Sequence, residues 1–279
     1  MGERGTVAGN AGELARRVRA FIEDASRGGG EIADMVGHLG AVGEVAIFGG
    51  MPRDLARGGA DAFRSDVDLV VDASSEALAE LLRDGPAVRN RFGGYRVAGH
   101  RHSYDVWALP STWAIRCGHV EATGLTDLLR TTFFDRDAVL YLCKADRVHH
   151  ARRYWSSLRH ATVDINLEAN PNTAGTIARA LRLVLDWEQK AGPRLVEYLS
   201  EKSRTSSHLL DHATRDRLQA LTTAWARSGE CQDAPSRRRG TGYRSRARPD
   251  RRQRCVCLSE PLSSDLQPGS PRQAPSRLG

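Results

Sequence analysis

Two short segments near the start of the chain combine residue types that suit the binding of a metal ion and of phosphate. The segment at 48–54 reads FGGMPRD, and the segment at 65–68 reads SDVD. Asp66 and Asp68 are two apart in a strand-like run, so their side chains point to the same face. Mg²⁺ binds few protein carboxylates and fills its other positions with water and substrate phosphates. The acidic pair therefore predicts a Mg²⁺ site that can hold a nucleotide.

The glycine pair within the first segment suits a close approach of the backbone to a ligand. The apolar residues 45–48 predict a buried strand, Gly49 and Gly50 allow a sharp turn, and a helix is expected over 51–57. Helical N–H groups that lack a partner near this start suit an anion such as a triphosphate. We expect Arg53 and the backbone at Gly49 and Gly50 to hold the phosphates.

A third carboxylate is usual in two-metal phosphoryl transfer, and Asp105 is the candidate. Residues 95–98 and 103–107 predict two strands joined by the polar turn 99–102, which reads GHRH. Asp105 would then lie on a strand beside the one that carries Asp66 and Asp68. We expect a two-ion Mg²⁺ site at these three carboxylates.

Each of these residues also has a structural interpretation. An acidic pair is often a solvated strand end, and two glycines before a helix are common turn chemistry. Arg53 and Asp54 could form a structural pair at the helix start rather than bind nucleotide. Ser65 could cap a turn rather than position phosphate. Apolar residues 69–71 follow the acidic pair, and unpaired carboxylates at the mouth of a buried strand are costly without a cation. This combination favours the metal site.

The segments described so far resemble the head domain shared by class II tRNA nucleotidyltransferases (CCA-adding enzymes) and bacterial poly(A) polymerases. Residues 49–54 are similar to that family's glycine-glycine-x-x-arginine-aspartate signature, and residues 66–68 to its metal-binding aspartate pair. Residues 92–97 and 104–106 are similar to the strand pair that bears its third carboxylate. The resemblance covers about residues 41–190 and implies a nucleoside triphosphate substrate and a tRNA-like 3′ end as acceptor.

Two later segments are similar to this family and also differ from it. Residues 131–141 resemble its arginine-arginine-aspartate-phenylalanine-threonine-x-asparagine-alanine segment, but they lack the paired arginines and have Phe133 and Asp137 in place of aspartate and asparagine. Residues 170–171 and 179–182 resemble the neck helix, without the glutamate-aspartate-x-x-arginine template that selects CTP or ATP. Metal and phosphate chemistry carry over from the resemblance, whereas base selection and the acceptor do not.

The order of strands and helices predicts an α/β (α+β) fold. As the resemblance implies, a nucleotidyltransferase (polymerase beta-like) head with a mixed sheet is followed by a small all-helical neck. The expected divisions are N-terminal helices at 1–40, the head at 41–168, the neck at 169–229 and a disordered basic tail at 230–279.

The expected helices are set by apolar residues at helical spacing. They cover 13–25, 32–39, 75–82, 173–189, 194–202 and 206–226. In the helix at 173–189, the expected apolar stripe consists of Ala178, Leu181, Val184 and Leu185.

The net charge of +7 is unevenly placed along the chain. Residues 230–279 contain eleven arginines and five acidic residues, so residues 1–229 carry only +1. Because residues 1–229 are nearly neutral, their charge does not argue for tight RNA binding. The arginines of the tail could grip RNA phosphates, or the tail could come from an extended or shifted reading frame of a GC-rich gene.

The chain lacks sequence signals for a membrane. No apolar run reaches the roughly 20 residues of a membrane span, and the N-terminus has no apolar signal-peptide core. We expect a cytoplasmic protein with no membrane partner. The sequence carries no signal from which an oligomeric state can be predicted.

Three functional hypotheses follow from these residues. The first is a Mg²⁺-dependent enzyme that moves a nucleoside monophosphate from a nucleoside triphosphate to an acceptor hydroxyl, with RNA or a tRNA 3′ end as acceptor. The second is an enzyme of the toxin, defence or resistance type that modifies a protein or a small molecule. The third is a non-catalytic module of the same fold that binds nucleotide or RNA.

Overall fold

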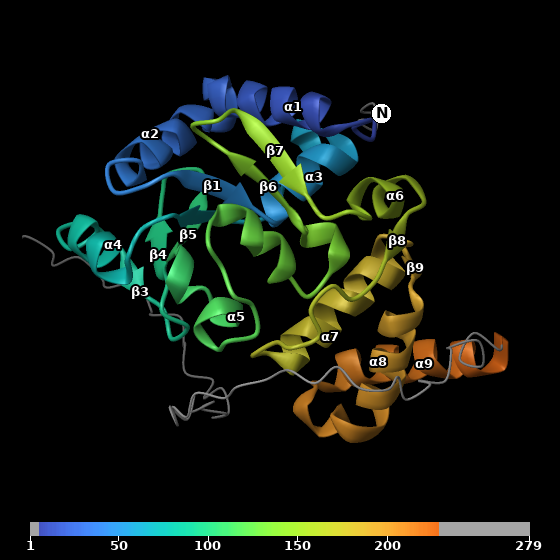
Figure 1. Cartoon of the computed structure of the whole chain (residues 1–279). Helices are drawn as coiled ribbons and strands as arrows, with labels where there is room; N and C mark the ends of the chain where they lie inside the picture. The colour runs from blue at the N-terminus through green and yellow to red at the C-terminus, as the bar shows by residue number, and fades with distance from the viewer. Residues whose placement is uncertain (1–5, 229–279) are drawn as a thin grey trace, which may run out of the picture. The chain divides into compact units, whose positions relative to one another are not determined.

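The computed structural model describes residues 6–228, so the predictions for the tail at 230–279 lie outside the described residues. Figure 1 shows the order of the elements. They are α1 (Ala11–Glu23), α2 (Gly29–Leu39), β1 (Val45–Phe48), α3 (Gly50–Gly58), β2 (Val67–Val71), α4 (Ser75–Leu81), β3 (Val88–Arg89), β4 (Tyr95–Ala98), β5 (Ser103–Ala108), α5 (Trp113–Arg116), β6 (Val139–Leu142), β7 (Arg147–His150), α6 (Tyr154–Arg159), β8 (Thr162–Val163), α7 (Thr173–Leu181), β9 (Lys190–Ala191), α8 (Pro193–Thr205) and α9 (His212–Ser228).

Seven strands form one mixed sheet in the order β3-β4-β5-β2-β1-β6-β7. β2 and β5 run parallel, and the other neighbouring strands run antiparallel. Parallel neighbours need a long crossover, which α4 and the β3–β4 pair supply here. This mixed sheet with helices packed on it confirms the α/β (α+β) fold class that the sequence predicts.

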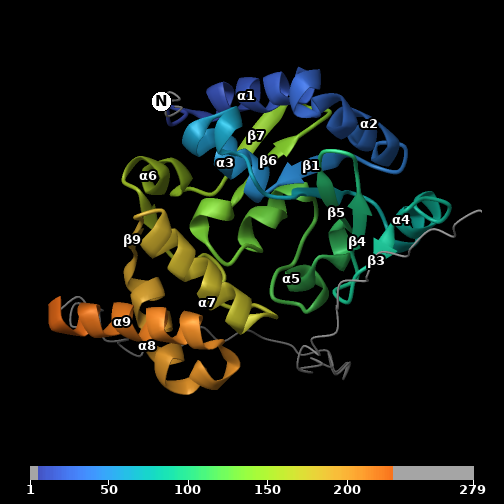
Figure 2. The same ribbon diagram turned by 180° about the vertical axis from the view of Figure 1, so that it is seen from behind.

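The two faces of the sheet differ because successive residues of a strand point to opposite sides. Val67, Leu69 and Val71 of β2 belong to the main apolar core. The N-terminal helices add their own buried side chains to this core: Leu14, Val18, Phe21, Ile32 and Leu39. In Figures 1 and 2, α1 lies over β7, and α2 lies farther along the sheet, where its Glu31 contacts the turn between β4 and β5. Each fully buried side chain contributes roughly 1.5–3 kcal/mol of transfer free energy.

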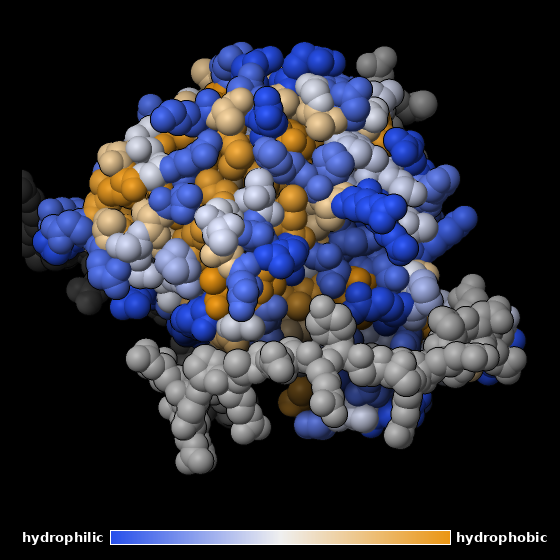
Figure 3. Space-filling view, in the orientation of Figure 1, coloured by the Kyte–Doolittle hydropathy of each residue, from blue (hydrophilic) through white to orange (hydrophobic). Residues whose placement is uncertain are grey.

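The first helix illustrates how the sequence sets an element. The Asn10 side chain accepts a hydrogen bond from the Glu13 N–H at 2.9 Å, which caps the start of α1. Leu14, Val18 and Phe21 then recur at helical spacing on the buried side. The upper edge of Figure 3, where α1 lies, is mostly hydrophilic.

The C-terminal helices pack around a second apolar core. α7, α8 and α9 contribute Ile177, Leu181, Leu195, Leu199, Leu218 and Trp225. Phe134 and Ile165, which face each other in an isolated β-bridge, complete this core from the segments around β6 and β8. Apolar contacts therefore join these helices to the segments that lie next to β6 and β8.

The helix expected over 173–189 ends earlier than the sequence pattern indicates. α7 stops at Leu181 and is followed by a π-helical turn, in which the Trp187 N–H donates to the Arg182 carbonyl at 3.0 Å. The wider turn shifts the phase of the side chains. Leu183 is 2% exposed whereas Leu185 is 39% exposed.

The expected stripe is wrong at both ends: Leu185, in the π-helical turn, is exposed, and Ala178, within α7, is exposed while its neighbours Ile177 and Ala180 are buried. Further along, β9 pairs in parallel with β8 within the region expected to be all-helical. The last helix begins at His212, after a short 3₁₀ turn at Ser207–Leu209.

No helix within residues 6–228 is long and apolar enough to cross a membrane. The domain divisions at 1–40, 41–168 and 169–229 stay predictions.

Two glycines provide a matched test of the backbone in this fold. A Cβ on Gly43, in the turn before β1, would lie 2.2 Å from the Asp72 carbonyl oxygen, whereas a Cβ on Gly37, inside α2, would meet nothing within 4 Å. We expect Gly43→Ala to lower the free energy of unfolding by about 1–3 kcal/mol and Gly37→Ala to raise it by about 0.5–1 kcal/mol. Urea denaturation measures both. Similar effects of the two substitutions would contradict this packing.

Candidate active site

Three charged side chains lie in one row across neighbouring strands. Asp68 of β2 is the direct partner of Asp105 of β5, and Asp105 is the direct partner of Arg96 of β4. Direct partners on adjacent strands share a face of the sheet. This row therefore lies on the face opposite to the main apolar core, and Asp66, two residues before Asp68, lies on the same face.

Arg96 joins two of the predicted metal ligands. Its Nη2 lies 2.9 Å from Asp66 Oδ2, and its Nη1 lies 3.0 Å from Asp105 Oδ2. Burial raises the pKa of the Asp105 carboxyl, and Arg96 opposes this rise. The guanidinium therefore neutralises part of the negative charge that the row collects.

Asp68 differs from its two neighbours because it has no such partner. Among residues 6–228 it forms no hydrogen bond or ion pair with another side chain. Burial and the nearby charge of Asp105 raise the pKa of Asp68 to about 7, against the opposing effect of Arg179. A carboxylate that is partly buried beside another carboxylate favours a bound cation or a proton.

The donor set fits a hard divalent cation in its chemistry. Asp68 offers an unpaired carboxylate, and Asp66 and Asp105 offer two more oxygen donors on the same face. Within the described part of the chain, no three His, Cys, Asp or Glu side chains are gathered as a metal-holding group. Occupation by Mg²⁺ stays a prediction.

The glycine turn between β1 and α3 brings the backbone next to this row. Gly49 adopts φ 66° and ψ −105°, which strongly favours glycine. A Cβ on Gly50 would lie 2.6 Å from Ser65 Oγ, so the two segments touch here. Ser65 Oγ itself donates to the Asp66 carbonyl at 3.1 Å. The small residues thus allow the two predicted motifs to meet.

Arg53 lies in a buried ion network that links α3 to α7. Its Nε donates to Asp54 Oδ1 at 2.9 Å, and its Nη1 donates to Asp137 Oδ1 at 2.6 Å. Asp137 Oδ2 also pairs with Arg179 Nη2 at 2.9 Å. Burial alone would raise the pKa of Asp137, but Arg179 and Arg53 hold it below its usual value. Arg53 thus forms the structural pair with Asp54 that the sequence allows, and its contact with phosphate stays a prediction.

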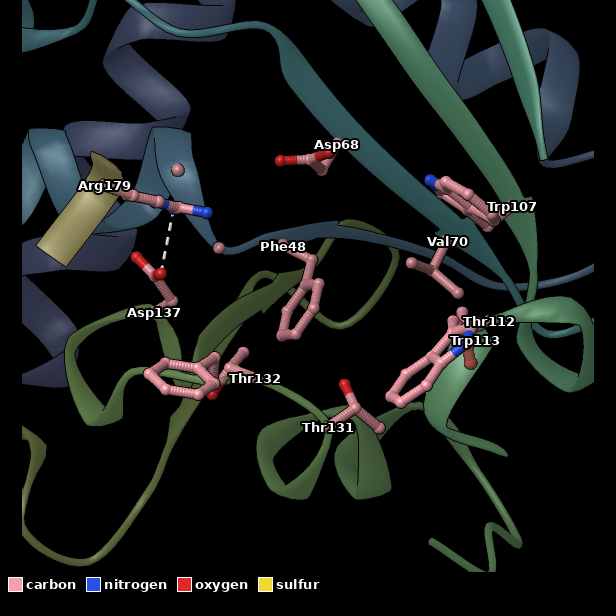
Figure 4. A pocket seen from close by; sticks show the side chains of 13 residues that line it. Phe48, Asp68, Val70, Trp107, Thr112, Trp113, Thr131, Thr132, Asp137 and Arg179 are labelled. Carbon is pink, nitrogen blue, oxygen red and sulfur yellow. Dashed lines mark ion pairs between the residues drawn. The ribbon is translucent and has the colours of Figure 1, made fainter. Parts of the chain in front are cut away.

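A pocket of about 240 Å³ opens beside Asp68 and the glycine turn. Its lining consists of Phe48, Gly49, Gly50, Asp68, Val70, Trp107, Thr112, Trp113, Thr131, Thr132, Phe133, Asp137 and Arg179. Figure 4 shows Arg179 and Asp137 on one side, Trp107, Val70 and Trp113 on the other, and Phe48 and Asp68 between them. The pocket thus has a charged side and an aromatic side.

The predicted site residues divide between the pocket and its surroundings. Those that line the pocket are Gly49, Gly50 and Asp68. Those outside its lining are Arg53, Asp54, Ser65, Asp66 and Asp105. Asp105 belongs to the row with Asp68, and Asp66 lies on the same face. Arg53 and Asp54 lie in the ion network that links α3 to α7.

Sequence reasoning missed four features of this site: the roles of Arg96 and Arg179, the ion pairs of Asp137 and the aromatic wall of the pocket. Arg96 had a usable signal, since the four-residue turn at 99–102 places it opposite Asp105. Arg179 comes from α7, and no local pattern indicates which strand end it faces.

Comparison with known proteins found no family model and no curated protein that matches the chain. The chain is similar to the solved structure of a tRNA nucleotidyltransferase complexed with a primer tRNA and an incoming ATP analog, with 18% identity, a TM-score of 0.45, and coverage of 68% of this chain and 59% of that one. It is also similar to a CCA-adding enzyme with CTP, with 16% identity, a TM-score of 0.47, and coverage of 73% and 51%.

The Bacillus stearothermophilus CCA-adding enzyme in complex with CTP is a third similar structure, with 17% identity, a TM-score of 0.46, and coverage of 63% of this chain and 43% of that one. The chain thus spans about half the length of these solved structures.

The raised pKa of Asp68 predicts a pH-dependent stability. Its ordinary value is 3.8 and its value in the folded chain is about 7, so the folded state binds more protons and loses stability as pH rises from about 4 to about 7. We expect Asp68→Asn to be more stable than the wild type at pH 8 by about 1–3 kcal/mol, with a gain that shrinks toward pH 4. Urea denaturation in the presence of EDTA measures this gain. A gain that is constant with pH would contradict the assignment.

The ion network predicts different costs for its two ends. Asp137→Ala leaves Arg53 buried with one partner lost, and we expect the free energy of unfolding to fall by about 3–5 kcal/mol. The Arg179 side chain is 41% exposed, so Arg179→Ala should cost at most about 1 kcal/mol. Chemical denaturation compares the two variants. Equal costs would mean that Asp137 does not stabilise the buried arginine.

Proposed function

We propose that the chain transfers a nucleoside monophosphate from a nucleoside triphosphate to an acceptor hydroxyl and releases pyrophosphate. The observation that most supports this is the position of Asp68. Its unpaired carboxylate faces a pocket that the Gly49–Gly50 turn also lines, and Asp105 stands beside it in the sheet. Acidic side chains next to a close-approaching backbone suit a substrate that carries both a metal ion and phosphates.

The chain's residues would divide the work of this reaction. Asp66, Asp68 and Asp105 would hold Mg²⁺, which when bound offsets the negative charge that gathers at the reacting phosphate. The Gly49–Gly50 backbone would approach the phosphates without steric conflict. Arg179 lines the pocket with a half-exposed guanidinium, which could contact the phosphates. Arg53, in contrast, is buried between Asp54 and Asp137. Catalysis would come from positioning and charge stabilisation.

The aromatic side of the pocket suits a flat base. Phe48, Trp107 and Trp113 offer apolar and aromatic surface, on which a base can stack. Thr112 and Thr131 donate their hydroxyl protons to the carbonyls of Leu109 and Leu128 at 2.9 and 2.8 Å. Their oxygens are then available as acceptors, which favours a base that carries an amino group.

Two alternatives are proposed for the acceptor of the nucleoside monophosphate. RNA, including a tRNA 3′ end, is the acceptor that the sequence resemblance implies. Modification of a protein or a small molecule is favoured by the near-neutral charge of residues 1–229 and by the missing base template. The cytoplasm is the proposed location for either activity.

A non-catalytic binding module is the second candidate function. Arg96 holds Asp66 and Asp105 in ion pairs, and Asp137 stands where the family has asparagine. Both features favour a site that binds nucleotide without turnover.

A transfer assay separates these candidates. The purified protein is incubated with Mg²⁺ and each α-labelled nucleoside triphosphate over total RNA and total protein. We expect label in one pool with one nucleotide, and a loss of about 100-fold or more in Asp68→Ala. Asp72→Ala, at the exposed residue that follows the same strand, should keep the wild-type rate.

Two results of this assay would count against the proposed transferase. Label that persists in Asp68→Ala would refute the assigned site. Nucleotide binding without label in either pool would favour the binding module.

A further inference from the structure

Arg96 occupies the position between two carboxylates that a divalent ion would also use. Both of its contacts, at 2.9 Å to Asp66 and at 3.0 Å to Asp105, are made to an Oδ2 atom. We propose that Arg96 is a built-in cation that competes with the divalent metal ion for Asp66 and Asp105, so that metal binding requires the guanidinium to move away. This inference rests on the proposed function only in placing the metal ion at these carboxylates.

Strand pairing places Arg96 beside Asp105. Arg96 pairs directly with Asp105 in the β4–β5 hairpin. Glu31 of α2 clamps the turn of this hairpin, since its Oε2 accepts the N–H groups of His100 and Arg101 at 3.1 and 3.0 Å, and its Oε1 accepts the Tyr104 hydroxyl at 3.0 Å. The strand pairing and the clamped turn hold the backbone of this hairpin, so we expect a change at the site to come from the Arg96 side chain.

The side chain is free to make that change. Arg96 is 46% exposed, and its ion pairs with Asp66 and Asp105 are its side-chain interactions within residues 6–228. Exposed ion pairs contribute only roughly 0.2–1 kcal/mol each. A divalent ion carries twice the charge of the guanidinium, so it can replace the guanidinium at these carboxylates.

Asp68 gives the incoming ion a place to start. It belongs to the same row but lies outside the arginine's ion pairs. Asp68 and Asp105 would hold the ion together, because these two residues are direct partners on adjacent strands. Arg96 thus raises the metal concentration at which the site fills and keeps the three carboxylates from repelling one another before it does.

The test measures metal binding and needs no turnover. Free Mn²⁺ is followed by electron paramagnetic resonance as it is titrated into the full chain without nucleotide. We expect Arg96→Gln to bind Mn²⁺ roughly 5- to 20-fold more tightly than the wild type. Arg89→Gln is the matched control, because Arg89 is an exposed arginine on the neighbouring strand β3 that forms no ion pair with the described acidic residues. Its Kd should change less than about twofold.

A second variant guards against a loss of folding. Arg96→Lys keeps the charge, but an ammonium group lacks the planar fork that spans two carboxylates. We expect its Kd to lie between those of the wild type and Arg96→Gln, and circular dichroism confirms that each variant is folded. Asp68→Asn in the Arg96→Gln background should lose the tight binding.

The outcomes separate this inference from the proposed function. Equal Mn²⁺ affinity in the wild type, Arg96→Lys and Arg96→Gln would overturn the competition and leave the metal site in place. Absence of saturable binding in all of them would overturn both. Tighter binding in Arg96→Gln by a chain that transfers no label would support the competition and refute the transferase.

Discussion

The hydrogen-bond register of three strands is the constraint on which the candidate site depends. It aligns Arg96, Asp105 and Asp68 across β4, β5 and β2 on one face of the sheet. A slip of one residue would move a charged side chain to the other face, where Val67 and Leu69 are fully buried. The burial of one face therefore holds the chemistry of the other in place.

A buried ion network is the second constraint, and it connects α3 to α7 through Asp137. Arg53 and Asp137 are 84 residues apart in sequence and almost fully buried. Removing such charges from water is costly, so each depends on the other and on Asp54 and Arg179. Because Arg179 belongs to α7, the same network sets where this helix meets the pocket. The charged side of the pocket and the position of α7 thus have one physical cause.

The local sequence pattern was enough to predict the strands that carry Asp66, Asp68 and Asp105. The apolar run at 45–48, the glycine turn and the alternation in 66–71 correspond to β1, the start of α3 and β2. The turn at 99–102 joins β4 to β5 and makes residue 96 the partner of residue 105. Arg96 could have been assigned from this register, since a four-residue turn and a period of two determine the pairing.

The pocket and the ion network could not be predicted in this way because they depend on how distant elements meet. The π-helical turn after α7 shows the limit, since its hydrogen bond from Trp187 to Arg182 adds a residue to one turn and exposes Leu185. A period of 3.6 does not register such a change. Asp137 shows the same limit in charge. Its sequence neighbours give no sign of a buried ion pair, yet its two oxygens bind arginines from α3 and α7. Chemistry that lies along a strand is therefore readable from the sequence, whereas chemistry between elements requires the fold.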